Sequence, residues 1–179
     1  MIDYQKILVV GTPCTGKTTL AKILGAQMHI KSIDLDDLHW LPGWQERPKE
    51  ELRHKIETEI IPLDQWIVSG NYTTAGRNNI WKEAQTVIWL DLPLSTILYR
   101  YVKRTYWRIR YKEECCNGNF ETLRDAVFSK EILLKYILRS HFVTRRPVYK
   151  RWMKNEMRNK QWIVCKSQSD VDQLTISNA

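Results

Sequence analysis

A glycine-rich segment near the start of the chain has residue types and spacing that suit the binding of phosphate groups. It reads GTPCTGKT, with Gly11, four intervening residues, and then Gly16, Lys17 and Thr18. Glycine lets the backbone bring its N–H groups up to phosphate oxygens, Lys17 adds a positive charge, and Thr18 offers a hydroxyl to Mg²⁺. The segment predicts a site for a nucleoside triphosphate, formed by Gly11, Thr12, Pro13, Cys14, Thr15, Gly16, Lys17, Thr18 and Thr19.

Carboxylates follow two of the expected strands. Asp36 and Asp37 come after a short strand around 33–35, and Asp91 ends a strand in TVIWLDLP. A carboxylate can accept the proton of an attacking hydroxyl, and small-molecule kinases, which this part of the chain resembles, carry an aspartate after the second strand for this role. The resemblance implies that Asp36 is catalytic, but Asp36 can equally cap the following helix. Asp91 is predicted to hold Mg²⁺ together with Thr18.

The basic charge of the chain is concentrated in one region. The net charge is +8, and residues 100–160 hold 17 Lys and Arg against 6 Asp and Glu. Arg100, Arg104 and Arg108 are four residues apart, so they share one helix face, where guanidinium groups can bind phosphate oxygens or pair with carboxylates. Aromatic residues are interleaved with these arginines, a combination that also suits single-stranded nucleic acid; those at positions 99, 101, 106 and 107 are expected to pack largely against the sheet.

The hydrophobic pattern predicts strands separated by helices, hence a parallel sheet covered on both faces. Strands are expected at 7–10 and 33–35 and in the segments WIVSGNY, TVIWLDLP and QWIVCKS. Helices are expected after the glycine-rich segment, at 46–61, 94–110, 120–128 and 129–140, after Pro147, and as a final turn in the polar tail. Ligands bind such sheets at the carboxyl ends of the strands, which gathers the residues above at one edge.

Length and composition predict one domain spanning residues 1–179. The sequence shows neither a signal peptide nor an apolar run of membrane-spanning length, so we expect a cytoplasmic protein without a membrane partner. Cys14, Cys115, Cys116 and Cys165 lack Cys-x-x-Cys spacing, so the sequence supports neither a zinc ribbon nor a secreted disulfide framework, and Cys115 and Cys116 are expected to be free thiols.

These motifs resemble the adenylate kinase-like P-loop kinase superfamily over most of the chain. GTPCTGKT matches its phosphate loop, WIVSGNY its third-strand segment and VIWLDLP its fourth strand. The resemblance implies a three-layer α/β/α P-loop NTPase with a five-stranded parallel sheet, an acceptor-binding insertion at about 36–62 and a helical lid region at about 100–160. It also implies that ATP and Mg²⁺ are bound and that the γ-phosphate is transferred to a nucleotide or another small molecule.

The resemblance assigns roles to particular arginines. In that superfamily, arginines nine and thirteen residues after the strand-ending aspartate reach the transferring phosphates, and Arg100 and Arg104 have this spacing. A later helix carries a further phosphate-binding arginine with a tyrosine four residues on, which Arg145 and Tyr149 reproduce, although Arg146 is an equal candidate. The usual adenylate kinase arginine close behind the second strand is missing, which argues against AMP as the acceptor.

A closer resemblance is to the topology modulation protein (FlaR-like) branch, whose name comes from an effect on DNA topology. It is carried by LDDLHWLPGW with Arg47 and Pro48, GNY with Arg77, TVIWLDLPL and NGNFETLRDAVFSKE. In the acceptor segment, Trp40 and Trp44 offer flat surfaces for a base or sugar, or belong to the core. The sequence favours a phosphotransferase and leaves two alternatives, an ATPase that acts on nucleic acid and a regulatory nucleotide-binding protein.

Overall fold

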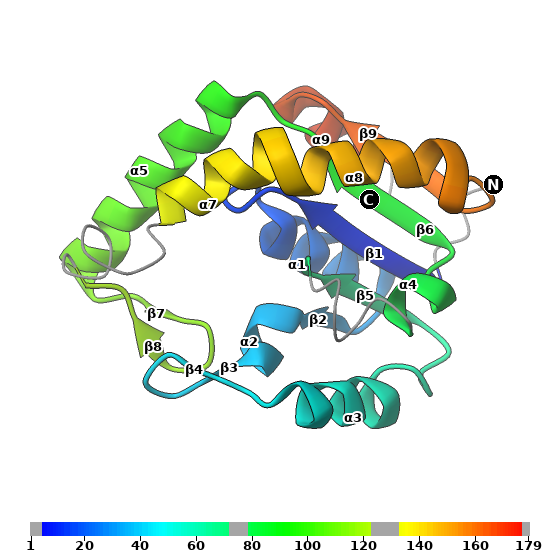
Figure 1. The fold of residues 1–179 in the computed structure, drawn as a ribbon, viewed down its shortest axis with the longest axis horizontal. Coiled ribbons are helices and arrows are strands. Elements are labelled where there is room, and N and C mark those ends of the chain that lie inside the picture. Colours follow the sequence, from blue (N-terminus) through cyan, green and yellow to red (C-terminus); the bar gives the residue numbers. More distant parts are fainter. Residues whose placement is uncertain (1–4, 72–78, 123–132, 177–179) are drawn as a thin grey trace.

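A five-stranded parallel sheet forms the centre of the molecule (Figure 1), seen in a computed structural model that describes residues 5–71, 79–122 and 133–176. The strand order is β2–β5–β1–β6–β9, and each neighbouring pair is parallel. The strands are β1 (Lys6–Gly11), β2 (Ser32–Asp34), β5 (Trp66–Ser69), β6 (Thr86–Leu90) and β9 (Gln161–Cys165). The predicted sheet is confirmed.

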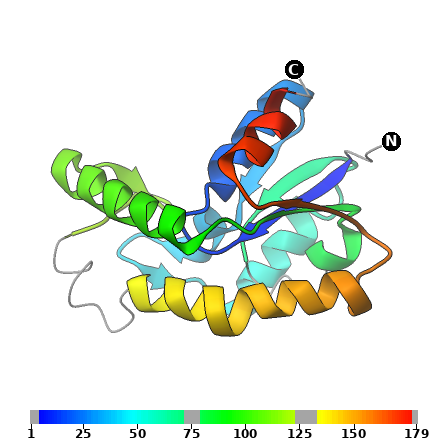
Figure 2. The same cartoon turned by 90° about the horizontal axis from the view of Figure 1, so that it is seen from above.

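Helices cover both faces of this sheet (Figure 2), so the predicted three-layer α/β/α fold is confirmed. One face carries α1 (Lys17–Met28) and α9 (Gln168–Ile176). The other carries α3 (Lys49–Glu59), α4 (Ile80–Glu83) and a continuous helical segment made of α7 (Leu133–Arg139), the π-helical turn η1 (Ser140–Thr144), α8 (Arg145–Arg151) and the π-helical turn η2 (Trp152–Glu156). The long helix α5 (Leu94–Tyr111) extends beyond the carboxyl edge of the sheet, and the short α2 (Leu35–His39) follows β2.

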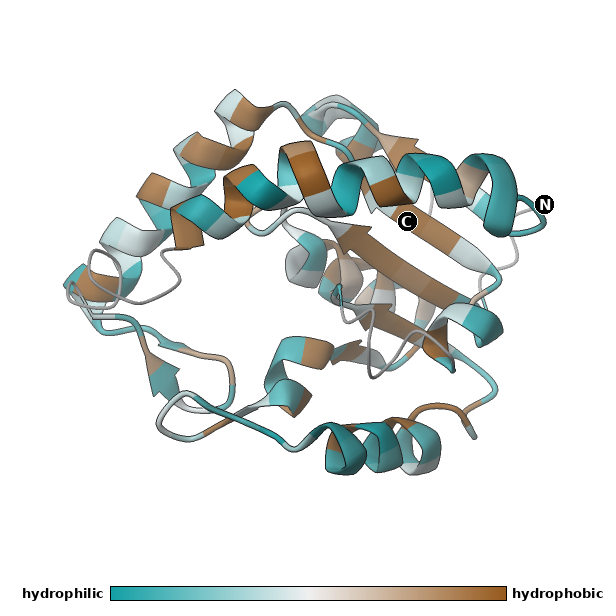
Figure 3. Ribbon diagram, in the orientation of Figure 1, coloured by the Kyte–Doolittle hydropathy of each residue, from teal (hydrophilic) through white to brown (hydrophobic). Residues whose placement is uncertain are grey.

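The central strands are buried because their side chains alternate between two cores. Along β1, Ile7 and Val9 pack with α1 and α9, whereas Leu8 and Val10 pack with α3 and α8. Figure 3 shows the hydrophobic residues concentrated on these strands, while α3 is largely hydrophilic. Each Å² of apolar surface that is buried stabilises the fold by about 25 cal/mol. The two cores are therefore the main support of the carboxyl ends of the strands, where the phosphate loop begins.

Two small hairpins replace parts of the expected helices. The helix expected at 46–61 begins only at Lys49, because β3 (Trp40–Leu41) pairs with β4 (Gln45–Glu46). The turn between these strands contains Gly43 and Trp44 at positive φ (77° and 56°), which reverses the chain.

The second hairpin pairs β7 (Glu114–Cys115) with β8 (Asn119–Phe120). Its turn holds Cys116, Asn117 and Gly118 at φ values of 44°, 60° and 83°. Phe120 was expected to start a helix and instead lies in a strand, so this boundary is corrected; the remaining 123–128, the first residues of the helix expected at 129–140, and Arg77 lie outside the described residues.

The end of the chain also differs from the sequence-based expectation. The basic helix expected after Pro147 begins at Arg145 and continues directly from α7 through η1. The π-helical turn η1 shifts the register of the backbone hydrogen bonds just before α8. This shift accommodates Pro147, which has no N–H group to donate. The polar tail forms the nine-residue helix α9, longer than the single turn expected.

Candidate active site

The phosphate loop connects β1 to α1 and is tightly packed. A Cβ atom added to Gly11 would lie 2.8 Å from the Leu90 carbonyl oxygen and 2.9 Å from Thr15 Oγ1, so no larger residue fits without a shift. Gly16 adopts φ 94°, in the left-handed region, directly before the first residue of α1. Both predicted glycine requirements are therefore visible in the backbone.

Lys17 lies at the amino end of α1 and donates from Nζ to the Thr12 carbonyl oxygen at 3.2 Å. Burial lowers the pKa of its ammonium group, and the charges of Asp36 and Asp34 act in the opposite direction. The charges of Lys17, the predicted phosphate-binding lysine, and of Asp36, the predicted acceptor carboxylate, therefore interact within one site.

The hydroxyl of Thr18 donates to Asp34, with 2.5 Å between Thr18 Oγ1 and Asp34 Oδ2. The other oxygen of Asp34 accepts from the backbone N–H of Asp36 at 3.0 Å, which makes Asp34 the cap of α2. Asp36 itself lies in the first turn of that helix, so the alternative that Asp36 caps the helix is wrong. Burial and the neighbouring Asp36 charge raise the pKa of Asp34, whereas its bond from Thr18 acts to lower it.

Asp34 was missed by the sequence-based reasoning, although its position at the end of a strand, two residues before Asp36, was a signal. Carboxylate and hydroxyl oxygens are ligands that suit Mg²⁺. Thr18 and Asp34 thus form a chemically suitable pair of donors for this ion.

Asp91 lies at the end of β6, as expected, and pairs with Arg146. Its Oδ1 accepts from Arg146 Nε at 2.6 Å and its Oδ2 from Arg146 Nη2 at 3.2 Å. Both carboxylate oxygens are therefore engaged by one guanidinium fork. The role of Asp91 as a metal ligand stays a prediction.

The arginines on the inner face of α5 lie over the phosphate loop and beside it. Arg100 donates from Nη1 to the Thr15 carbonyl oxygen at 2.7 Å, and it also bonds to Gln168. Arg104 and Arg108 share the Glu121 carboxylate, at 3.4 Å and 2.5 Å. Their roles in binding phosphate stay predictions, and Glu121 is a partner that no sequence signal indicated.

Asn71, the middle residue of GNY, connects the phosphate loop to α8. Its Oδ1 accepts from the Gly11 N–H at 3.2 Å and from the Tyr149 hydroxyl at 2.9 Å, and its Nδ2 donates to the Gly11 carbonyl oxygen at 2.6 Å. The Asn71 carbonyl oxygen accepts from Arg145, which also bonds to the Tyr136 hydroxyl at 3.2 Å. One buried amide thus fixes the first residue of the phosphate loop and the helix that carries Arg145.

Replacing Asn71 with aspartate is expected to destabilise the fold by about 1–3 kcal/mol, because an acceptor replaces the Nδ2 donor opposite the Gly11 carbonyl oxygen in a buried site. Tyr149→Phe removes one bond to the same residue and should cost only about 0.5–1.5 kcal/mol. Urea unfolding of the two variants measures both values. Equal stabilities for Asn71→Asp and the original chain would contradict the role given to Asn71.

The acceptor side is formed by the β3–β4 hairpin. Trp40 and Trp44 are half-buried, lie outside the buried clusters and pack edge to face, with ring centroids 5.5 Å apart. Arg47, one of the residues that carry the FlaR-like resemblance, donates from Nε to the Leu38 carbonyl oxygen at 2.7 Å and pairs with Glu51. Its guanidinium therefore already has two partners within the protein.

The aromatic residues at positions 99, 101, 106 and 107 of α5 were expected to pack largely against the sheet, and this expectation is wrong for three of the four. Tyr99, Tyr106 and Trp107 are 66%, 60% and 40% exposed. Only Tyr101 packs against a buried cluster. The reason is that the three arginines occupy the helix face that turns inward, which leaves the rings on the outward face.

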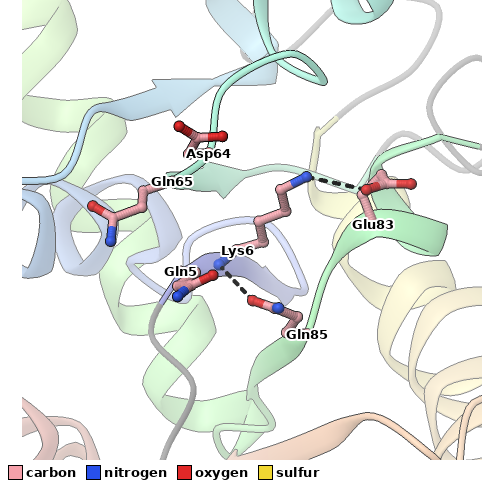
Figure 4. A pocket seen from close by; sticks show the side chains of 6 residues that line it. All are labelled: Gln5, Lys6, Asp64, Gln65, Glu83 and Gln85. Atoms are coloured by element: carbon pink, nitrogen blue, oxygen red, sulfur yellow. Dashed lines mark hydrogen bonds and ion pairs between the residues drawn. The ribbon is translucent and has the colours of Figure 1, made fainter.

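A pocket at the opposite edge of the sheet is formed around Lys6, which pairs with Glu83 at 3.1 Å (Figure 4). It lies at the amino ends of the strands, whereas ligands of parallel sheets bind at the carboxyl ends, so we do not assign it to phosphate chemistry.

Over the described ranges, no cluster of three or more His, Cys, Asp or Glu suits a metal ion, and no helix has the length and apolar character needed to cross a membrane.

Comparison with known families places the geometry in context. The sequence pattern of a family described as AAA domain matches residues 7–121. The chain belongs to this family. The matched part of the AAA domain runs from β1 to Glu121 and so includes the phosphate loop, the Asp34–Thr18 pair and the arginines of α5. No curated protein matches the chain.

Solved structures share the fold at low sequence identity. A gluconokinase from Sinorhizobium meliloti 1021 is 15% identical with a TM-score of 0.56, over 99% of this chain and 93% of that one. A shikimate kinase from Bacteroides thetaiotaomicron is 15% identical with a TM-score of 0.54, over 96% of each chain. The AAA domain protein described here therefore has a P-loop kinase fold.

Proposed function

We propose that this chain is an ATP-dependent kinase that transfers the γ-phosphoryl group of ATP to a hydroxyl of a small molecule. The observation that carries the proposal is the cluster at the carboxyl ends of β1 and β2. Thr18 bonds to Asp34 at 2.5 Å, and the charges of Asp34 and Asp36 both act on Lys17. A phosphate-binding lysine, donors for Mg²⁺ and a separate carboxylate for the acceptor are the groups that this reaction needs.

Each group has a defined part in this proposal. Thr18 and Asp34 would hold Mg²⁺, which supplies positive charge to the phosphates when bound. Asp36 takes the proton of the acceptor hydroxyl while the hydroxyl oxygen attacks the γ-phosphorus and ADP leaves. Lys17 stabilises the charge that develops on the phosphate oxygens.

Arg100, Arg104 and Arg145 complete the charge stabilisation. Arg100 and Arg145 donate to backbone carbonyl oxygens, which are neutral acceptors. Phosphate oxygens form stronger, charge-assisted bonds with guanidinium groups, so a nucleotide can exchange these partners. Arg104 must in addition leave Glu121.

A hydroxyl acceptor is favoured over the phosphate of a nucleoside monophosphate. Asp36 lies in the first turn of α2 and its charge acts on Lys17, so a carboxylate is present to take the proton of a hydroxyl acceptor, a step that a phosphate acceptor does not need. Two solved structures that share the fold, a gluconokinase and a shikimate kinase, are by name small-molecule kinases, which agrees with this choice. We assign acceptor binding to residues of about 36–62 and the lid to residues of about 100–160. We also place the chain in the topology modulation protein (FlaR-like) branch, because it carries the motifs that resemble this branch.

The proposal is tested by product detection. The protein is incubated with Mg²⁺ and ATP labelled in the γ position, together with a mixture of sugars, sugar acids and other hydroxylated metabolites. A product that carries the label and requires Lys17 supports a kinase. Label found only in inorganic phosphate, with every acceptor, would refute it.

A second candidate, an ATPase that acts on single-stranded nucleic acid, is favoured by the outward face of α5. Trp107 and Tyr111 stack with ring centroids 4.7 Å apart, Arg110 lies over Tyr111 at 5.6 Å, and the helix contains no acidic residue. Exposed rings and cationic side chains are the two components of such binding surfaces.

This candidate predicts that single-stranded DNA binds with an affinity that falls steeply with salt, and that it stimulates ATP hydrolysis. Trp107→Ala should weaken binding by about 1–3 kcal/mol, the value of one stacked base. Phe142→Ala removes an exposed ring (62% exposed) outside α5 and serves as the control. Fluorescence anisotropy measures both, and DNA binding that is absent or equal in the two variants would exclude the candidate.

A further inference from the structure

Two adjacent cysteines lie where the lid region meets the acceptor region. Cys115 ends β7 and Cys116 begins the turn of the β7–β8 hairpin, and both are free thiols that are hydrogen-bonded to each other. Cys115 keeps 8% of its surface exposed, and Cys116 is half-buried. The phosphotransfer reaction proposed above uses neither residue.

The same hairpin is bonded to the acceptor hairpin β3–β4, more than 70 positions away in the sequence (Figure 1). Asn119 accepts from the Trp44 N–H at 2.8 Å and donates to the Leu41 carbonyl oxygen at 3.0 Å. Asn117 donates to the Trp40 carbonyl oxygen at 3.0 Å. We call these three hydrogen bonds the clasp.

The thiols and the clasp share one turn. The second N–H of the Asn119 amide donates to the Cys116 carbonyl oxygen at 2.7 Å, so the backbone of the cysteine turn orients the side chain at the centre of the clasp. The charge of Asp36 also acts on the Cys116 thiol, which locates this turn near the acceptor carboxylate. The cysteine turn, the clasp and the acceptor carboxylate are therefore neighbours.

The pKa of the Cys115 thiol is shifted in the opposite direction from those of Cys14 and Cys165. The hydrogen bond from Cys116 lowers the pKa of Cys115 to about 7, burial opposes this, and the Arg108 charge adds to the lowering. Burial instead raises the pKa of Cys14, and it raises that of Cys165 to about 11. Since the thiolate is the reactive form, Cys115 is the thiol in the chain best suited to attack an oxidant near neutral pH.

We propose that Cys115 and Cys116 form a reversible oxidation site, at which a peroxide converts the two thiols into a disulfide and thereby opens the clasp. The Cys115 thiolate attacks one oxygen of hydrogen peroxide; the O–O bond breaks, and the leaving hydroxide takes a proton to become water. Cys116 then attacks the sulfur of the resulting sulfenic acid, the S–S bond forms, and a second water leaves. The two thiols lose two electrons, and the peroxide is reduced to two waters.

The clasp opens because the disulfide does not fit the present turn. Adjacent Cα atoms are about 3.8 Å apart, whereas disulfides usually join Cα atoms about 4.4–6.8 Å apart. The peptide bond keeps this distance fixed, so the S–S bond can close only as a strained eight-membered ring. This ring constrains ψ of Cys115 and φ of Cys116, and it thereby turns the Cys116 carbonyl group that orients Asn119. A strained disulfide is also easily reduced, so a dithiol should reverse the change.

The experiment uses the full chain without any acceptor, so it is independent of the proposed kinase reaction. The protein is treated with hydrogen peroxide, and the peptide that contains both cysteines is analysed by mass spectrometry, while hydrogen exchange is followed at the Trp44 amide. We expect loss of two hydrogens from this peptide and about tenfold faster exchange at Trp44, which corresponds to the loss of one net hydrogen bond. Dithiothreitol should restore both.

Variants separate the two thiols from the rest of the chain. Cys116→Ser should stop at a sulfenic acid on Cys115 that a dimedone-type reagent traps, whereas Cys165→Ala should oxidise like the original protein. Failure of the original protein to form the disulfide between Cys115 and Cys116, or its loss in Cys165→Ala, would overturn the oxidation site. A disulfide that leaves the Trp44 exchange rate unchanged would overturn its coupling to the clasp.

Discussion

Replacing Lys17 with alanine is expected to lower the rate of phosphotransfer by about 10³-fold, because a positioned cation that stabilises charge in the transition state is worth this much in a water-poor site. Lys17 is anchored to Thr12 and lies at the amino end of α1, so its charge adds to the positive end of the helix. The ATP affinity should fall as well, since the same charge binds the ground state. ADP release and ATP titration measure the two effects.

The control for this variant is Lys22→Ala, which removes an exposed lysine from the same helix. Its turnover and its ATP affinity should match those of the original chain. If Lys17→Ala retained more than a tenth of the turnover, the phosphate loop would not be the site of the reaction. Far-ultraviolet circular dichroism of both variants should match that of the original chain, which checks that the overall helical content is kept.

Asp36→Asn is expected to lower kcat by about 10²–10⁴-fold and to leave ATP affinity within a few-fold of the original value, because a general base acts on the acceptor. Asp34 caps α2, so removal of the Asp36 charge leaves the cap in place. The variant therefore separates chemistry from folding. Single-turnover kinetics with a saturating acceptor measure the effect directly.

Asp37→Asn provides the matched comparison, because Asp37 is exposed and lies in the same turn of α2. It should change kcat by less than threefold, as expected for a screened surface charge. Equal losses in the two variants would indicate a general electrostatic effect instead of proton transfer by Asp36. Retention of full activity by both would move the catalytic carboxylate elsewhere.

Local patterns predicted the sheet and the phosphate loop well. The β-branched run of β1 and the fixed spacing of GTPCTGKT each lie within a few residues, so their structure follows from neighbouring side chains. The alternation of strands with helices then restricted the topology to a parallel sheet.

Features that depend on contacts between distant residues could not be predicted in this way. The pairing of Asp91 with Arg146 spans 55 positions, and nothing near either residue indicates it. The hairpin at Phe120 depends on left-handed turn residues together with contacts to Trp44, which overrode a helical pattern. On α5, helical spacing identified two faces, but only the position of Glu121 and the loop determined that the arginines face inward.

The most direct test of the central claim is a coupled assay of ADP release with ATP and Mg²⁺, run with a panel of hydroxylated small molecules, nucleoside monophosphates, nucleosides and single-stranded DNA. A kinase with Asp36 as its base should show turnover that depends on a hydroxylated acceptor and is lost in Lys17→Ala and Asp36→Asn. Turnover raised only by DNA, or raised by a nucleoside monophosphate and unaffected by Asp36→Asn, would contradict it.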